Sequence, residues 1–203
     1  MALYGRSIWN DFTISLRQGN VVLWLITVNL AIFILQAFVG VIGFLFMADN
    51  AVFSTFYQNY FYAPSSLSNL LYRPWTILTY AFFHADFWHI LFNLLYLYWF
   101  GRIFQVYQSE KRLLNLYLLG ALVGSAFYVL SYNTFPVFEQ AKHKAYLLGA
   151  SGAVWSIIAA TMATNPAYRI RLFILGSVPL WGIVLFMFGR DLLSFQSNPG
   201  GIL

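Results

Sequence analysis

The sequence predicts an all-α fold, a polytopic bundle of membrane-spanning helices. Of its 203 residues, 61% are hydrophobic and only 8% are charged, and the mean hydropathy is +0.69. A water-soluble domain has about 25% charged residues, so this composition excludes a soluble globule. Five long apolar stretches with almost no charge supply the helices, and the length suits one domain rather than two.

The N-terminal residues 1–20 are predicted to be an amphipathic segment at the cytoplasmic membrane surface. Apolar residues such as Ile8, Trp9 and Phe12 alternate with polar ones there, a pattern typical of helices that lie in the interface. The segment has no apolar core of the kind that a cleavable signal peptide requires.

Residues 21–46 contain no charged residue and are long enough to cross about 30 Å of hydrocarbon, so they form the first predicted span. Residues 47–87 follow as a long interfacial loop, because their many aromatic side chains suit the headgroup region. The remaining spans are predicted at 88–104, 113–132, 147–164 and 180–195. The fourth is short, which indicates a helix that begins below the surface inside the bundle.

The third predicted span carries Gly120 and Gly124 on one helical face. Small residues at this spacing allow two helices to approach closely. We favour packing within the bundle over dimerisation, because several neighbouring helices are available.

Orientation is predicted from the lysine and arginine residues of alternating connections. One side carries Arg6, Arg17, Arg102, Lys111, Arg112, Arg169 and Arg171, and the other carries Arg73, Lys142, Lys144 and Arg190. The larger group places the N-terminus in the cytoplasm. A short cytoplasmic head without an organelle transit signal favours a bacterial inner membrane.

Two polar residues of the second span, His89 and Asn93, are four positions apart and share one helical face. His84 precedes them at the helix start, where Asp86 is suited to cap the helix. Polar side chains inside a membrane indicate a functional site. A solvated polar belt is the alternative, and it fits His84 alone better than the His89 and Asn93 pair.

Ser151 lies between Gly149 and Gly152 at the start of the fourth span. Glycines permit tight turns, and the free N–H groups of a helix N-terminus stabilise a developing oxyanion. Taken alone, the motif fits a capping serine beside small packing residues better than it fits a nucleophile.

The sequence predicts no metal site and no cofactor. Cysteine is absent, and the three histidines (His84, His89 and His143) form no His-Glu-x-x-His motif. The scattered basic residues predict no nucleic-acid binding. A small transporter would show internal repeats, and none is visible.

Together these motifs resemble the rhomboid family of intramembrane serine proteases. Residues 78–84 and 89–95 are similar to the signature of the family's second helix, and residues 149–152 are similar to its Gly-x-Ser-Gly nucleophile motif. Trp75, Gly101 and the Gly120/Gly124 pair also fit, and the resemblance extends over residues 20–203.

The resemblance implies a Ser-His dyad protease that cleaves transmembrane protein substrates within the lipid bilayer, near its outer leaflet. Ser151 would be the nucleophile. His89, Asn93 and the Ser151 backbone N–H would line the oxyanion hole, with His84 in a supporting role. The fifth span and the loop after it would form a lateral gate for the substrate.

The sequence departs from the family pattern at two places. Gln105 replaces a glutamate at the foot of the second helix, where we expect little consequence because an amide still forms hydrogen bonds. The family's general base, a histidine in an Ala-His-x-x-Gly context on a sixth helix, has no counterpart in the printed sequence. We therefore expect a chain truncated before that helix, with five of the usual six spans, that is inactive as it stands.

The alternative is a rhomboid-like pseudoprotease that binds membrane clients without cleaving them. The presence of Ser151, His89 and Asn93 together favours the enzyme.

Overall fold

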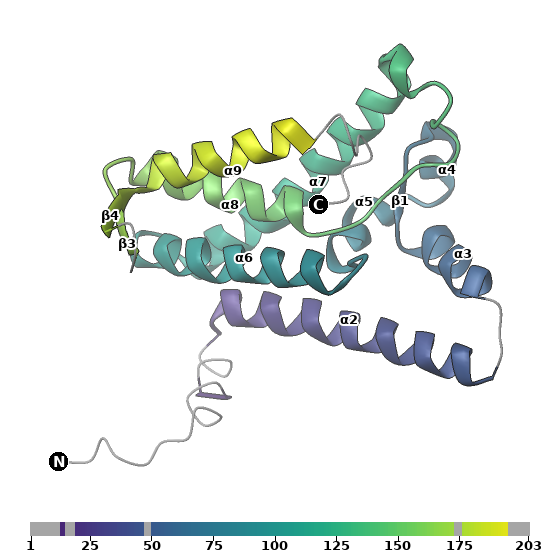
Figure 1. The fold of residues 1–203 in the computed structure, drawn as a ribbon, viewed down its shortest axis with the longest axis horizontal. Coiled ribbons are helices and arrows are strands. Elements are labelled where there is room, and N and C mark those ends of the chain that lie inside the picture. The colour runs from purple at the N-terminus through teal and green to yellow at the C-terminus, as the bar shows by residue number, and fades with distance from the viewer. Residues whose placement is uncertain (1–12, 15–18, 47–49, 173–175, 195–203) are drawn as a thin grey trace.

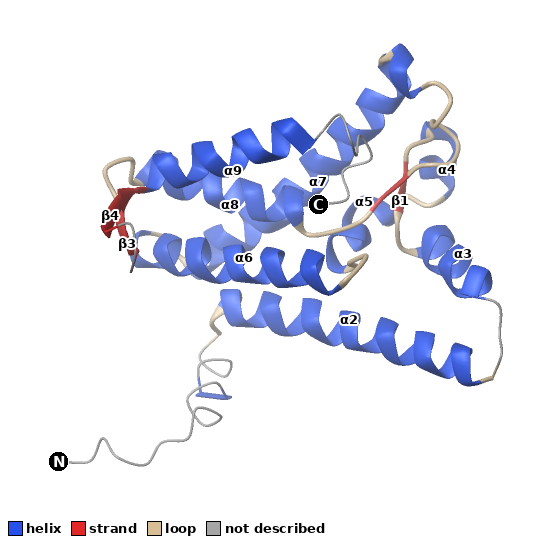
Figure 2. Ribbon diagram, viewed as in Figure 1, coloured by secondary structure: helices blue, strands red, loops and turns tan. Residues whose placement is uncertain are grey.

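The computed structural model describes residues 13–14, 19–46, 50–172 and 176–194. Helices dominate these residues, and strands occur as two small pairs (Figures 1 and 2). The predicted amphipathic segment 1–20 lies outside the described residues except at four positions. The fold is the predicted helical membrane bundle.

The first long helix, α2 (Val21–Leu45), begins at Asn20, whose side chain accepts a hydrogen bond from the Leu23 N–H at 3.0 Å. This contact satisfies one of the free N–H groups at the helix start. The first half of α2 packs against α6 (Phe87–Tyr107), where a Cβ on Gly101 would lie 2.6 Å from Val22. Gly101 therefore permits this close approach.

Helix α8 (Ser151–Thr164) packs against both α6 and α7 (Glu110–Thr134). At the α7–α8 seam, a Cβ on Gly152 would lie 3.5 Å from the Gly124 Cα. The prediction that the glycines of α7 serve helix packing within the bundle is confirmed. The seam places the start of α8 beside the middle of α7.

The predicted fourth span, 147–164, includes residues that are not helical. Tyr146–Leu147 form strand β2, which pairs antiparallel with β1 (Ala63–Pro64), and α8 begins at Ser151. The strand forms because its partner comes from the distant interfacial loop, which a local apolar pattern does not reveal. The helix is therefore shorter than the apolar run.

The predicted interfacial loop 47–87 contains several short helices. They are α3 (Asn50–Tyr60), α4 (Leu67–Tyr72), α5 (Thr76–Thr79) and the 3₁₀ turn η1 (Tyr80–Phe82). A second 3₁₀ turn, η2 (Pro136–Phe138), follows α7. Ser65, just after β1, donates its hydroxyl to the Lys142 and Ala145 carbonyls at 2.6 and 2.9 Å. These bonds tie the interfacial loop to the segment that leads into α8.

The connection from α8 to α9 (Leu180–Ser194) is an antiparallel hairpin of β3 (Arg169–Leu172) and β4 (Gly176–Pro179). Its base is closed by a hydrogen bond from the Leu180 N–H to the Tyr168 carbonyl at 2.8 Å. Figure 1 shows this hairpin beyond one end of the long helices. It sets α9 alongside α8.

Among the described residues, α2 and α7 are long and apolar enough to cross a bilayer. Helix α8 and residues Leu180–Gly189 of α9 are also apolar but shorter. Much of α2 presents large apolar side chains to its surroundings. Examples are Ile34, Leu35, Phe38, Val41, Phe44 and Leu45. A helix that is apolar on most of its surface is typical of a membrane span.

The ends of α2, α6 and α7 meet at one carboxylate. Glu110 accepts hydrogen bonds from the Val21 N–H at 2.8 Å and from the Gln105 amide at 2.6 Å. Gln105 therefore works as a donor, and Glu110 supplies the carboxylate at this junction. This arrangement explains why an amide is suited to position 105.

Candidate active site

The start of α6 fixes the backbone of His89. Asp86 has an extended backbone, and its side chain accepts a hydrogen bond from the His89 N–H at 2.9 Å. The predicted capping role of Asp86 is confirmed. His89 is 4% exposed and points inward from the first turn of the helix.

Among the described residues, one ring nitrogen of His89 has a hydrogen-bond partner and the other has none. Its Nδ1 accepts from the Ala85 N–H at 3.4 Å, so the proton of the neutral ring lies on Nε2. Nε2 is buried and has no hydrogen-bond partner among the described residues. A Cβ on Gly149 would lie only 2.5 Å from this nitrogen. The donor therefore lies directly against the turn that precedes Ser151.

That turn depends on glycine. Gly149 has a φ of +112°, in the region that residues with a Cβ rarely adopt. Its N–H donates to the Tyr80 carbonyl at 3.0 Å. Both the backbone angle and the contact with His89 exclude a larger residue at this position.

His84 lies in the loop before α6 and supports the same turn. Its Nε2 accepts from the Ala150 N–H at 3.4 Å, and its ring meets that of His89 edge-on, with the centroids 5.1 Å apart. Burial and, secondarily, the neighbouring His89 lower the pKa of His84 to about 3. His84 is therefore a neutral hydrogen-bond acceptor near neutral pH.

Ser151 is the first residue of α8 and is half-buried. The N-cap residue Ala150 makes no side-chain hydrogen bond to this helix start, and the N–H groups of a first helical turn lack acceptors within the helix. Asn93 lies one turn beyond His89 on α6, is 6% exposed, and donates to the His89 carbonyl at 2.8 Å. The two residues directly before Ser151 contact the histidines, Gly149 beside His89 and Ala150 through its N–H to His84.

Two other residues from the sequence analysis lie differently. Gly152 faces α7 across the helix seam, so its small size serves packing. His143 is exposed in the turn between η2 and β2, whereas the other two histidines are buried. The described residues contain no group of three or more His, Cys, Asp or Glu side chains that would hold a metal ion.

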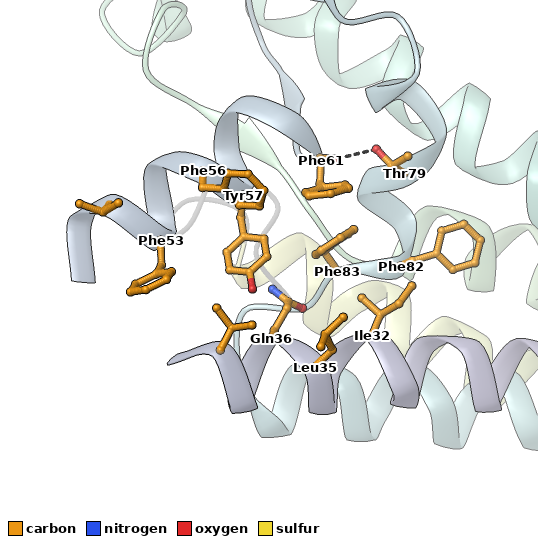
Figure 3. A pocket seen from close by; sticks show the side chains of 12 residues that line it. Ile32, Leu35, Gln36, Phe53, Phe56, Tyr57, Phe61, Thr79, Phe82 and Phe83 are labelled. Carbon is orange, nitrogen blue, oxygen red and sulfur yellow. Dashed lines mark hydrogen bonds between the residues drawn. The ribbon is translucent and has the colours of Figure 1, made fainter. Parts of the chain in front are cut away.

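The sequence reasoning missed an apolar cavity of about 660 Å³ next to this site. It lies between α2, α3 and the η1 region, and its walls are mainly aromatic (Figure 3). Phe82 and Phe83, which immediately precede His84, form one wall, and Gln36 of α2 points its amide toward the space. The cluster of aromatic residues at 53–61 is the sequence signal that could have indicated it.

A hydrogen bond from a side chain to the backbone holds the interfacial-loop wall of the cavity. Thr79 donates its hydroxyl to the Phe61 carbonyl at 2.8 Å, as Figure 3 shows. The rings of Phe61 and Phe83 stack with their centroids 4.7 Å apart. The interfacial loop therefore packs directly on the segment that carries His84.

The fold and the site define a polytopic helical membrane protein in which the Gly149–Ala150 turn, directly before Ser151, contacts two buried histidines. Residues 72–200 match the family model of the rhomboid domain. The chain is also 30% identical, over 208 aligned residues, to the RHOMBOID-like protein 12, mitochondrial, of Arabidopsis thaliana. No solved structure matches.

The chain belongs to the rhomboid family, and it is an integral membrane protein. The alignment with the plant relative covers 98% of this chain and 57% of the relative's length.

Proposed function

We propose that the protein is an intramembrane serine endopeptidase that cleaves transmembrane protein substrates near the outer leaflet of the bilayer. Ser151 attacks the scissile carbonyl, and a histidine takes its proton. Family membership supports this reaction class. The chemistry needs neither a metal ion nor another cofactor, because a serine and a base are sufficient for acyl transfer.

The observation that carries the proposal is the Nε2–H of His89, which has no hydrogen-bond partner in the described part of the chain. A buried donor without a partner is costly, and this one lies against Gly149, two residues before Ser151. An oxyanion formed at Ser151 would satisfy it. We assign His89, Asn93 and the Ser151 backbone N–H to the oxyanion hole, in which each donor contributes about 10²- to 10³-fold to kcat.

His84 does not act as the general base in this proposal. Its Nε2 already accepts the Ala150 N–H, and its low pKa opposes proton uptake. The base is instead the histidine of the family's Ala-His-x-x-Gly motif, which the 203 residues do not contain. The 203-residue chain is therefore expected to react about 10²- to 10⁴-fold more slowly than a polypeptide extended by that motif.

A fluorophosphonate probe, which labels activated serines, tests the proposal. In the extended polypeptide, Ser151 is expected to label, the Ser151→Ala variant to lose all labelling, and the Ser156→Ala variant to label normally. Ser156 is the matched control because it lies on the same helix five residues further on. Equal labelling of the 203-residue chain and the extended polypeptide would contradict the assignment of the base.

The same experiment separates the enzyme from the pseudoprotease. An extended polypeptide that never labels, yet co-purifies with transmembrane clients, would establish client binding without cleavage. Labelling at Ser151 together with cleavage of a transmembrane substrate in proteoliposomes would establish the enzyme.

The topology of the protein is part of the proposal. We place the N-terminus on the cytoplasmic side of a bacterial inner membrane, on the basis of the lysine and arginine bias. The printed name of the plant relative assigns that protein to mitochondria, and a positive N-terminal side is compatible with either membrane. The orientation is tested below with single cysteine substitutions.

A further inference from the structure

Tyr80 joins the start of α8 to α7, although the proposed reaction does not use its side chain. It lies in η1 and is 1% exposed. Its hydroxyl donates to the Ala121 carbonyl in the middle of α7 at 2.8 Å. The side chain thus fixes the η1 turn to a long helix that is 41 residues away in sequence.

The glycines of the α7–α8 seam leave room for this hydroxyl. A Cβ on Gly124 would lie 3.0 Å from the Tyr80 hydroxyl oxygen, and a Cβ on Gly152 would lie 3.5 Å from it. The small residues therefore serve two purposes, because they allow the helices to approach and they admit a polar group between them. Alanine at position 124 would press directly on that group.

The backbone of the same tyrosine holds the turn before the proposed nucleophile. The Tyr80 carbonyl accepts the Gly149 N–H at 3.0 Å, and Gly149 lies two residues before Ser151. One residue thus connects the middle of α7, through its hydroxyl, with the Gly149 turn, through its carbonyl. The distance of the turn from α7 depends on both bonds.

We propose that Tyr80 is a positioning residue for Ser151. Its hydroxyl anchors η1 to α7, and its carbonyl holds the Gly149 turn in the position that aligns Ser151 with His89. The inference rests on the proposed function for the role of Ser151, whereas the anchoring itself is independent of any activity. A tyrosine that merely fills the core would be replaced by phenylalanine without effect on the turn.

The test compares Tyr80→Phe with Ser156→Ala in the full chain, extended by the base motif and reconstituted in lipid. Ser156 is the matched control, because its hydroxyl also donates to an α7 carbonyl, that of Leu116 at 2.8 Å, but lies away from the turn. The first readout is hydrogen exchange of the segment 147–152. The second is the rate of fluorophosphonate labelling at Ser151.

Tyr80→Phe is expected to raise hydrogen exchange of segment 147–152 and to lower the labelling rate about 3- to 10-fold, the effect of one neutral hydrogen bond. Ser156→Ala is expected to leave both unchanged. If Tyr80→Phe shows faster hydrogen exchange but Ser151 of the parent protein does not label, the result would support the anchoring and reject the proposed function. Unchanged exchange and labelling in Tyr80→Phe would overturn the inference.

A second set of variants covers the case in which Tyr80→Phe fails to fold. Gly124→Ala keeps the hydroxyl but displaces it, so it is expected to raise exchange of the same segment. In the double variant Y80F/G124A the hydroxyl is absent, so the methyl group introduced by G124A has room. The effect of Gly124→Ala on hydrogen exchange is then expected to disappear. Contacting residues show this kind of non-additive coupling, so strictly additive effects on exchange would count against the anchor.

Discussion

At the scale of single residues, the site depends on the backbone angle of Gly149 and on the Nε2 donor of His89. Gly149 adopts a φ of +112° against the ring of His89, and His89 Nε2 faces it without a partner among the described residues. The sequence predicted these residues as site members from spacing and family resemblance. It did not reveal Tyr80, because the partners of Tyr80 lie 41 and 69 positions further along the chain.

Gly149→Ala is expected to abolish labelling of Ser151. The added methyl would meet His89, and the backbone strain alone costs about 1–3 kcal/mol. Gly19→Ala is the matched control, since Gly19 also has a positive φ of +79° but none of the described residues lies within 4 Å of a Cβ built there. Labelling rates and thermal unfolding of both variants check the prediction, and normal labelling of Gly149→Ala would contradict it.

The pH dependence of stability follows from His84. Its pKa is about 3 in the folded protein and about 6.5 when unfolded, so between these values the unfolded chain binds more protons. Stability is therefore expected to fall as the pH decreases from 6.5 toward 3 and to be independent of His84 above that window. In His84→Gln, the free energy of unfolding measured in detergent is expected to fall less between about pH 6.5 and 3. The same pH profile in the variant and the parent protein would contradict the role of His84.

At the scale of elements, sequence reasoning located the apolar helices well because hydrophobicity is a local property. It placed the start of the fourth helix at 147, whereas α8 begins at Ser151. Leu147 instead pairs with Ala63, a contact between segments far apart in sequence. The β3–β4 hairpin was likewise not predicted from the sequence. Non-local pairing is what the local pattern could not show.

Glu110 joins the ends of α2, α6 and α7, so replacing it tests how much this junction contributes to stability. Glu110→Ala removes the acceptor of the Val21 N–H and of Gln105, so the free energy of unfolding is expected to fall by about 1–3 kcal/mol. Glu139→Ala is the control, because Glu139 is exposed in the turn after η2. Unfolding in mixed micelles measures both, and equal stabilities of the two variants would refute the role of the junction.

At the scale of the whole molecule, composition predicted a membrane protein, which the family match supports, and the charge bias predicts an orientation. The absence of cysteine from the sequence allows a direct test. Lys144→Cys and Arg112→Cys introduce exposed thiols in connections predicted to lie on opposite sides. An impermeant maleimide is expected to label Lys144→Cys in intact cells. It is expected to label Arg112→Cys only after the cells are permeabilised. The reverse pattern would invert the topology.

The pairing of β1 with the segment before α8 also constrains the order of assembly. Ser65 bonds to Ala145, 80 residues later. A ribosome adding about 5–20 residues per second needs roughly 4–16 s to make that stretch. For most of that interval the nascent chain carries both histidines of the site but not yet the serine. The proposed site is therefore assembled late in biogenesis, after most of the surrounding scaffold has entered the bilayer.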